Sequence, residues 1–290
     1  MMNQGSSHKP RKRFGQNFLQ DAAIIERIVD AIRPERGGRL VEIGPGQGAI
    51  TNRVLARMED DQALVVVELD RDLAAVFQER ALQTPTLEVI QADILKVDLA
   101  DLLRAESGQV KLFGNLPYNI SSPLLIRLVE THVRLLLEED SEGICSDMVF
   151  MLQKEVVDRI VAKPGSKTYG RLSVVIQSVF DAAPLFDVPP KAFYPSPKVM
   201  SSILRLSPKR EPLVEAKTFR KFQKIVTAAF AQRRKTLKNT LRGIAAEQEF
   251  SAAQIDPSLR AETLAVEDFV RLSHAIHDDV DGESGITRLK

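Results

Sequence analysis

The sequence predicts an α/β protein in which a doubly wound domain with a parallel sheet is followed by a small all-α domain. The first observation is a short apolar segment, 40–43, that leads into a glycine-rich turn and then into a helix from about Ala49. The second is that four successive apolar strands end at glycine or polar residues, which are Gly44, Glu68, Asp93 and Asn115. The third is that the segments after a linker at 207–212 all have helical periodicity.

The N-terminal segment is predicted to hold a basic arm and one amphipathic helix. Residues 1–12 are expected to form a flexible arm that carries Arg11 and Lys12, and Arg13 follows directly. Asp21 is a favourable N-cap for a helix over 22–33. Five aliphatic residues at helical spacing predict the buried face of that helix: Ile24, Ile25, Ile28, Val29 and Ile32.

The ends of the first three sheet strands have side chains suited to an adenosine-containing cofactor. The turn at 44–48 reads G-x-G-x-G, in which glycine lets a ligand approach the backbone, although an ordinary tight turn is the alternative. Glu68 ends the strand at 63–67 and can accept from both ribose hydroxyls, while Asp93 can accept from an adenine amino group. In a parallel sheet these ends lie along one edge, where open α/β sheets bind ligands.

The fourth strand leads into the turn Asn115-Leu116-Pro117-Tyr118, which has the groups needed to hold an aminated base. Pro117 fixes its own φ and keeps Leu116 out of the helical region. The Asn115 oxygen and the carbonyl of Leu116 or Pro117 can accept the two hydrogens of an exocyclic amine, and the Tyr118 ring can stack on the base. The alternative is a strand-to-loop turn in which Asn115 caps the following helix.

The remaining segments continue the alternation of helices and strands and then become helical. We predict a helix at 124–137, an acidic loop at 138–145, a strand at 148–152 and a helix at 153–162. The apolar segment 172–180 fits a helix or a strand, and a proline-rich loop at 188–198 carries Phe193 and Tyr194. The predicted final strand is 199–206, and the predicted C-terminal helices are 219–232, 236–246, 252–255 and 266–277.

Composition indicates a globular protein of the cytoplasm. The chain has 290 residues, 44% of them hydrophobic and 27% charged, and no apolar run approaches the length of a membrane span. The N-terminus lacks the hydrophobic region of a secretion signal. Cys145 is the only cysteine, so no internal disulfide can form. His274 and His277 have no third ligand nearby, and we therefore expect no metal site.

The net charge of +1 hides a strongly basic region. Residues 217–242 contain nine Lys or Arg and no Asp or Glu, and acidic runs elsewhere compensate. Such a region is typical of a polyanion-binding surface, although a solvated helix face is the alternative. The predicted RNA-binding residues are the basic arm with Arg11, Lys12 and Arg13, together with Arg233, Arg234, Lys235 and Lys238.

Eight motifs carry a resemblance to a known family, at 13–19, 42–46, 68–70, 115–118, 152–156, 169–173, 195–199 and 232–237. Through them the chain resembles the bacterial small-subunit ribosomal RNA adenine N6-dimethyltransferases over roughly residues 9–270. The resemblance implies a Rossmann-like class I S-adenosylmethionine-dependent methyltransferase domain at 13–207, whose seven-stranded sheet has an antiparallel last strand. It also implies a helical RNA- or ribosome-binding domain at 208–290.

The resemblance also implies roles for individual residues. Asn17 and Leu19 would close over S-adenosyl-L-methionine, with Gly44 and Gly46 near its methionine part. Glu68 would bind the ribose, Asp93 the adenine, and Asn115 would lie beside the methyl group. Phe193 would stack on the target base opposite Tyr118, with the neighbouring Tyr194 as the alternative.

The function that the resemblance implies is N6,N6-dimethylation of two adjacent adenosines near the 3′ end of small-subunit (16S) ribosomal RNA during ribosome biogenesis. The expected partner is an immature 30S particle, and the expected state is a monomer. Three other functions stay open: a large-subunit rRNA methyltransferase of the macrolide-resistance type, a DNA adenine methyltransferase, and an RNA-binding assembly factor. The segment 232–237 argues for the small-subunit enzyme, and Leu116 argues against a DNA enzyme. The presence of Asn115, Tyr118, Glu68 and Asp93 argues against binding alone.

Overall fold

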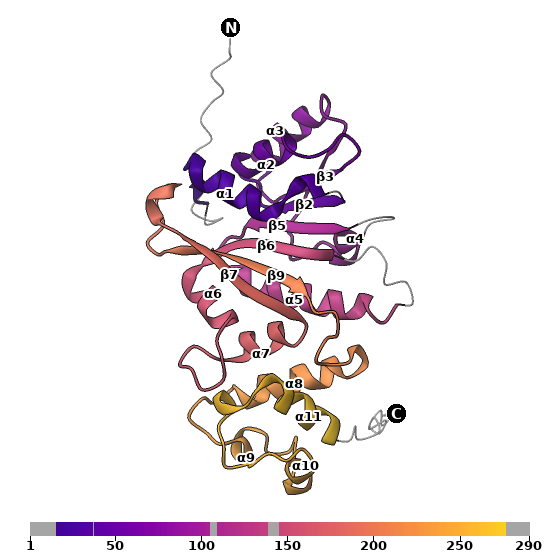
Figure 1. Ribbon diagram of the computed structural model, residues 1–290, viewed down its shortest axis with the longest axis vertical. Helices are drawn as coiled ribbons and strands as arrows, with labels where there is room; N and C mark the ends of the chain where they lie inside the picture. Colours follow the sequence, from indigo (N-terminus) through magenta and orange to yellow (C-terminus); the bar gives the residue numbers. More distant parts are fainter. Residues whose placement is uncertain (1–15, 37, 105–108, 139–144, 277–290) are drawn as a thin grey trace, which may run out of the picture.

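The computed structural model describes residues 16–36, 38–104, 109–138 and 145–276. The predicted RNA-binding residues Arg11, Lys12 and Arg13 lie outside the described residues, as do His277 and most of the acidic loop. The molecule is elongated, with the sheet toward one end and the C-terminal helices at the other (Figure 1).

The main sheet has seven strands in the order β4-β3-β2-β5-β6-β9-β7. Six strands run in one direction, and only β9 in this sheet is antiparallel to its neighbours, which are β6 and β7. The last strand is therefore the antiparallel one, as expected. The bounds are β2 Arg39–Ile43, β3 Leu64–Glu68, β4 Leu87–Gln91, β5 Val110–Asn115, β6 Cys145–Gln153, β7 Phe180–Val188 and β9 Ser201–Pro208.

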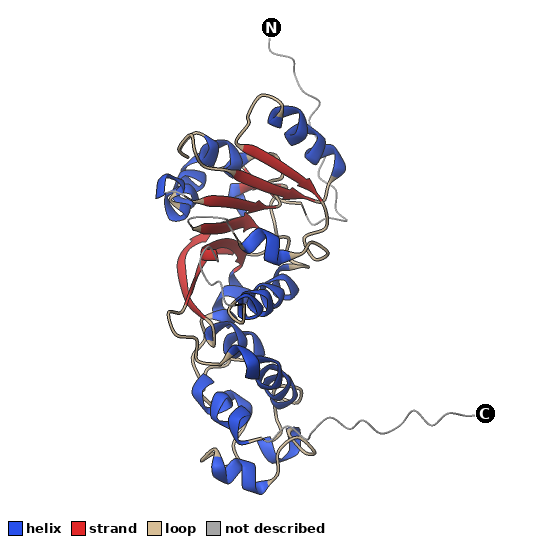
Figure 2. Cartoon of the chain, turned by 90° about the vertical axis from the view of Figure 1, so that its right-hand side faces the viewer, coloured by secondary structure: helices blue, strands red, loops and turns tan. Residues whose placement is uncertain are grey.

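Helices cover both faces of the sheet (Figure 2). On one face, α1 (Ala22–Ile32), α2 (Ala49–Leu55) and α3 (Arg71–Ala81) share a core with alternate residues of the strands. On the other face lie α4 (Leu99–Leu103), α5 (Ser121–Leu135) and α7 (Arg171–Gln177), and α6 (Lys154–Ile160) packs beside α7. The doubly wound arrangement places the carboxyl ends of β2 to β5 along one open edge.

The structure confirms the predicted first helix. The Asp21 carboxylate accepts from the backbone N–H groups of Ala23 and Ile24 at 3.0 and 3.1 Å, which satisfies two donors that the helix leaves unpaired. The five aliphatic residues predicted to face inward are its buried residues. They pack against the sheet, so the helical spacing of these residues determines which side of α1 faces the sheet.

Strand β7 was not among the predicted strands. The apolar segment 172–180 contains most of α7, and β7 begins at its last residue, Phe180. From there β7 runs through residues 181–187, for which no element was predicted, and ends at Val188, the first residue of the predicted loop. It contains Pro184, which is tolerated because β7 lies at the edge of the sheet, and its pairing with β9 shifts register between Pro184 and Phe186. A proline at the centre of a sheet would have removed a ladder hydrogen bond.

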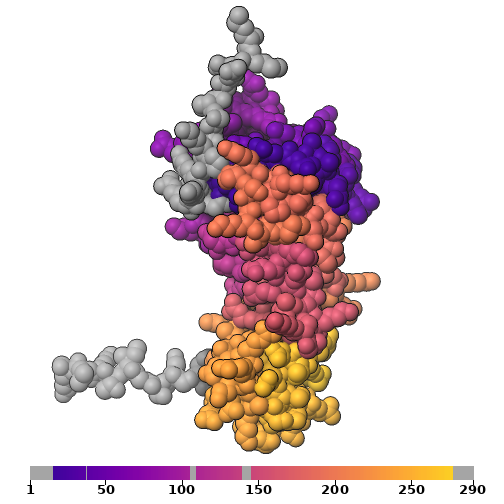
Figure 3. Space-filling view, turned by 90° about the vertical axis from the view of Figure 1, so that its left-hand side faces the viewer, coloured from indigo at the N-terminus to yellow at the C-terminus, as the bar shows by residue number. Residues whose placement is uncertain are grey.

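The C-terminal helices form the lobe at the orange and yellow end of the molecule (Figure 3). They are α8 (Phe219–Ala229), α9 (Leu237–Thr240), α10 (Glu247–Ala252) and α11 (Val266–Ala275). The predicted helix at 252–255 was wrong, because the chain leaves α10 after Ala252 and Gln254 takes a left-handed conformation with φ 57°. The predicted helix at 236–246 was too long, because it ends before Gly243 at φ 78°. Helix α8 packs against α7 and α11, which joins this lobe to the core of the sheet.

Candidate active site

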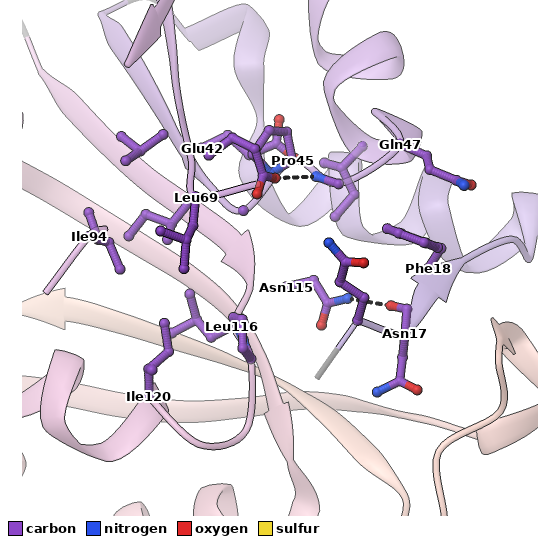
Figure 4. A pocket seen from close by; sticks show the side chains of 18 of the residues that line it. Asn17, Phe18, Glu42, Pro45, Gln47, Leu69, Ile94, Asn115, Leu116 and Ile120 are labelled. Atoms are coloured by element: carbon purple, nitrogen blue, oxygen red, sulfur yellow. Dashed lines mark hydrogen bonds between the residues drawn. The ribbon is translucent and has the colours of Figure 1, made fainter. Parts of the chain in front are cut away.

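A cavity of about 370 Å³ lies at the carboxyl ends of β2 to β5 (Figure 4). Every residue predicted to bind the cofactor lines this cavity: Asn17, Leu19, Gly44, Gly46, Glu68, Asp93 and Asn115. Leu116, Pro117 and Tyr118 line it as well. Four strand ends and the N-terminal segment, separate in sequence, therefore meet at one site.

The glycine turn is held between the N-terminal segment and Glu68. Gly44 and Gly46 have φ values of 67° and 57°, a conformation that side chains disfavour. A Cβ on Gly46 would lie 3.1 Å from the Phe18 ring. The Gly46 N–H donates to Glu68 Oε2 at 3.1 Å, and the Asp70 N–H donates to Oε1 at 2.8 Å. Burial raises the pKa of Glu68, while these backbone donors lower it.

Hydrogen bonds from Leu95 and Arg127 hold the turn that carries Asp93 in place. Asp93 Oδ1 accepts from the Leu95 N–H at 3.0 Å, and Arg127 of α5 donates to the carbonyls of Ile94 and Val97, each at 3.0 Å. Helix α5 begins at Ser121, shortly after the turn at 115–118. Arg127 therefore links the turn that carries Asp93 to the helix that follows the turn at 115–118.

The N-terminal segment crosses the cavity as a short strand. β1 (Phe18–Leu19) pairs antiparallel with β8 (Phe193–Tyr194), and the Gln20 N–H donates to the Ala192 carbonyl at 2.8 Å. Asn115 Nδ2 donates to the Asn17 carbonyl at 3.2 Å, a contact between residues 98 positions apart (Figure 4). Because the amide nitrogen is used in this bond, the carboxamide oxygen is left as the acceptor at this strand end.

The backbone carbonyls of Leu116 and Pro117, which follow Asn115, differ in whether a described residue already donates to them. The Leu116 N–H donates to the Met151 carbonyl and the Pro117 carbonyl accepts from the Ile120 N–H, both at 3.1 Å. Among the described residues, none donates a hydrogen bond to the Leu116 carbonyl. Of the two carbonyls considered from the sequence, that of Leu116 is therefore the one available to a ligand.

Tyr118 and the two aromatics of the proline-rich loop differ in exposure. The Tyr118 hydroxyl shares a 2.8 Å hydrogen bond with Ser201 Oγ at the start of β9. Phe193 is 5% exposed, packs in the core opposite Leu19 and is not among the residues that line the cavity, whereas Tyr194 is 62% exposed beside Phe18. The base-stacking role of Phe193 stays a prediction, and the exposed ring in this arrangement is that of Tyr194.

Glu42 is a cavity residue that the sequence reasoning missed. It is 1% exposed, and the Thr51 hydroxyl donates to its Oε2 at 2.7 Å. Burial raises its pKa to about 8, the Thr51 hydrogen bond opposes that rise, and the nearby Glu68 adds to it. The sequence does indicate that Glu42 is unusual, since it is the one charged residue of the apolar segment 40–43.

The predicted RNA-binding residues of the C-terminal region lie away from the cavity lining, in or near the turn between α8 and α9. Arg233 forms an ion pair with Glu262 at 2.8 Å and also donates to the Lys167 carbonyl. Lys238 lies 3.9 Å from Glu247. Arg234 and Lys235 are exposed and form no ion pair with other described residues. The basic residues of this region thus divide into paired and unpaired ones.

Two further features concern other kinds of site. Within the described part of the chain, no group of three or more His, Cys, Asp or Glu is arranged to hold a metal ion. In the same part, no helix has the length and apolar character needed to cross a membrane.

Comparison with known sequences gives a match along almost the whole chain. A family model described as ribosomal RNA adenine dimethylase matches residues 7–278. The chain is similar to ribosomal RNA small subunit methyltransferase A of Xanthomonas oryzae pv. oryzae, with 47% identity over 273 residues, 94% of this chain and 98% of that protein. It is similar to the protein of the same name from Aromatoleum aromaticum, with 49% identity over 271 residues, 93% and 96% of the two chains.

Two solved structures share the fold over most of the chain. A dimethyladenosine transferase from Plasmodium falciparum gives a TM-score of 0.70 at 21% identity, covering 88% of this chain and 95% of that one. The 23S rRNA methyltransferase ErmE gives a TM-score of 0.63 at 22% identity, and the match covers 90% of this chain and 99% of that one. The predicted class I methyltransferase fold with C-terminal helices is thereby confirmed.

Proposed function

Since this chain belongs to the ribosomal RNA adenine dimethylase family, we propose that it transfers methyl groups from S-adenosyl-L-methionine to N6 of two adjacent adenosines near the 3′ end of small-subunit ribosomal RNA. The observation that carries the proposal is the convergence of Asn115, the Leu116 carbonyl and Tyr118 on a cavity that also contains Glu68 and Asp93. We further propose that the substrate is an immature 30S particle in the cytoplasm and that the protein acts as a monomer.

The cavity lining suits S-adenosyl-L-methionine in the proposed roles. Glu68 would accept from the ribose hydroxyls and Asp93 from the adenine amino group, while the turn at Gly44 and Gly46 would lie against the methionine part. Asn17 and Leu19 would cover the ligand from the N-terminal segment. When bound, the cofactor supplies a methyl group activated by its positively charged sulfur.

The residues at 115–118 would prepare the adenosine amine for attack. The N6 lone pair is delocalised into the ring, which makes the amine a poor nucleophile. Acceptance of its two hydrogens by Asn115 Oδ1 and the Leu116 carbonyl would favour a tetrahedral nitrogen with its lone pair directed at the methyl group. The bond from Asn115 to the Asn17 carbonyl supports this role, because it fixes the carboxamide orientation before the substrate arrives.

A methyl-transfer assay tests the function and separates it from the alternatives. Immature small subunits, naked small-subunit RNA, large-subunit RNA and DNA are each offered with labelled S-adenosyl-L-methionine. We expect two adjacent dimethylated adenosines, and the fastest transfer on immature small subunits. Faster transfer to large-subunit RNA or to DNA would reject the proposed substrate, and binding to small subunits without transfer would indicate an assembly factor.

We predict that Tyr118→Phe retains most of the activity, while Tyr118→Ala loses it. Base stacking on an aromatic ring contributes about 1–3 kcal/mol, and Phe keeps the ring. The hydroxyl holds the ring to β9 through Ser201, a bond worth about 0.5–1.5 kcal/mol. Because burial raises the pKa of Tyr118, the hydroxyl stays protonated at neutral pH and cannot serve as a base.

Ser201→Ala is the matched control, because it removes the same hydrogen bond from the other side. Steady-state kinetics should give Ser201→Ala and Tyr118→Phe similar, small defects. If Tyr118→Phe is as inactive as Tyr118→Ala while Ser201→Ala is normal, the hydroxyl acts on the substrate and the stacking account is wrong.

We predict that the double substitution of Arg234 and Lys235 by Gln weakens binding to small-subunit RNA and reduces its salt dependence. Each phosphate contact that is lost should lower the slope of log affinity against log salt by about 0.7–0.9. Both side chains are exposed and unpaired within the described residues, so the melting temperature should not change. Affinity for S-adenosyl-L-methionine should also stay constant, because neither residue lines the cavity.

Arg233→Gln provides the contrasting variant. Its loss leaves Glu262 unpaired and removes the donor to the Lys167 carbonyl, so it should lower the melting temperature instead. A wild-type salt slope in the Arg234 and Lys235 variant would show that these residues do not touch RNA, and would direct attention to the basic arm.

A further inference from the structure

Glu42 has a position that the proposed cofactor contacts leave unexplained. It lies on β2, two residues before Gly44, and contributes to the cavity wall although it is almost fully buried. A buried carboxylate is costly unless it is paired or hydrogen-bonded by several donors. Among the described residues, Glu42 has a single side-chain hydrogen bond, from the Thr51 hydroxyl of α2.

No cation among the surrounding described residues compensates the charge. The residues beside Glu42 in the sheet are Val66 on β3 and Phe113 on β5, both uncharged. The charged group that acts on Glu42 is another carboxyl, Glu68, which disfavours ionisation. Asp93 adds a third carboxyl to the cavity lining. In the cofactor-free protein, the neutral acid is therefore the stable form of Glu42 at neutral pH.

The proposed ligand would change this balance, because S-adenosyl-L-methionine has a positively charged sulfur and an ammonium group against one carboxylate. Its net charge is therefore +1, whereas the product S-adenosyl-L-homocysteine has lost the sulfur charge and is neutral overall. A cation placed in a cavity of low polarity stabilises a nearby carboxylate strongly, because the field is poorly screened there.

We propose that Glu42 is protonated in the cofactor-free protein and gives up its proton when S-adenosyl-L-methionine enters the cavity, so that the site distinguishes the cationic cofactor from its neutral product. The inference rests on the proposed function, which supplies the ligand. On binding, the Glu42 O–H bond breaks and the proton passes to solvent. After methyl transfer, the carboxylate faces a neutral ligand, takes a proton back from solvent, and the product is held less tightly.

The proton count on binding tests the proposal directly. Titration calorimetry of the full chain in two buffers of different ionisation enthalpy gives the protons released per ligand. For a group with a pKa of about 8, release at pH 7 can approach about 0.9 proton, and affinity should rise by up to about tenfold per pH unit below pH 8. The amino group of the ligand titrates with either protein, so the difference between wild type and Glu42→Gln is the measured quantity.

We expect Glu42→Gln to lose most of that release and most of the pH dependence with S-adenosyl-L-methionine. With S-adenosyl-L-homocysteine, wild type and Glu42→Gln should differ much less. Thr51→Val keeps the carboxyl but removes the hydrogen bond that lowers its pKa, so the midpoint of the pH dependence should move to higher pH. This second variant tests the same idea if Glu42→Gln folds poorly.

Three results would overturn the inference: equal proton release by wild type and Glu42→Gln, equal release with the two ligands, or an unmoved midpoint in Thr51→Val. Each of these can occur while cofactor binding and methyl transfer are normal, in which case the proposed function survives. If S-adenosyl-L-methionine did not bind at all, both the inference about Glu42 and the proposed function would be rejected.

Discussion

Asn115→Ala is expected to lower the turnover number for methyl transfer by about 10²–10³-fold, the typical cost of removing one preorganised group from a polar transition-state site. The carboxamide oxygen would accept from the adenosine amine most strongly as the nitrogen becomes tetrahedral, so the loss should fall on turnover more than on RNA affinity. The fold should persist, because Asn115 lies at the end of β5 and its side chain bonds only to the Asn17 carbonyl among the described residues.

Asn115→Asp is the informative companion variant. Aspartate keeps an accepting oxygen but cannot donate to the Asn17 carbonyl, so the side chain loses the contact that orients it. We expect activity between those of wild type and Asn115→Ala in single-turnover assays on immature small subunits. Near-normal turnover of Asn115→Ala would show that the carboxamide is not the partner of the amine.

Much of the site could be predicted because its residues stand at the ends of regular strands. A buried parallel strand is recognisable from a few apolar residues, and parallel strands bring their carboxyl ends to one edge. Gly44, Glu68, Asp93 and Asn115 were each found in this way, and all line the cavity.

The features that escaped prediction depend on contacts between distant segments. The two-residue strands β1 and β8 are too short to show periodicity, yet their pairing brings Asn17 to the cavity and turns Phe193 inward. The edge strand β7 contains a proline, which indicates a loop when sequence is read alone. Arg233 stands in a basic run, but its partner Glu262 is 29 residues away.

The ionisation state of a side chain also cannot be predicted from the residues next to it in sequence, and Glu42 is an example. Its neighbours in sequence predict a buried strand, but its protonation depends on burial beside Glu68 and on Thr51 from the next helix.

We predict that Glu42→Gln becomes progressively more stable than wild type as pH rises. The pKa of Glu42 is about 8 in the folded protein and near 4.5 in the unfolded chain. A raised pKa means that the folded state holds the proton more tightly, so its stabilising contribution is complete below pH 4.5 and is lost as pH rises toward 8. Between pH 4.5 and 7.5 the difference in unfolding free energy should change by roughly 2–4 kcal/mol in favour of Glu42→Gln.

Urea unfolding at pH 4.5, 6.0 and 7.5 measures this change without any ligand. The exposed Glu79→Gln on α3 is the matched control, and its stability relative to wild type should stay constant across the same range. Gln can still accept from the Thr51 hydroxyl, so the comparison isolates the charge from the packing. A constant difference between Glu42→Gln and wild type would mean that Glu42 is already ionised in the folded protein. It would then have to be stabilised by water or by a movement of α2 that brings further donors to it.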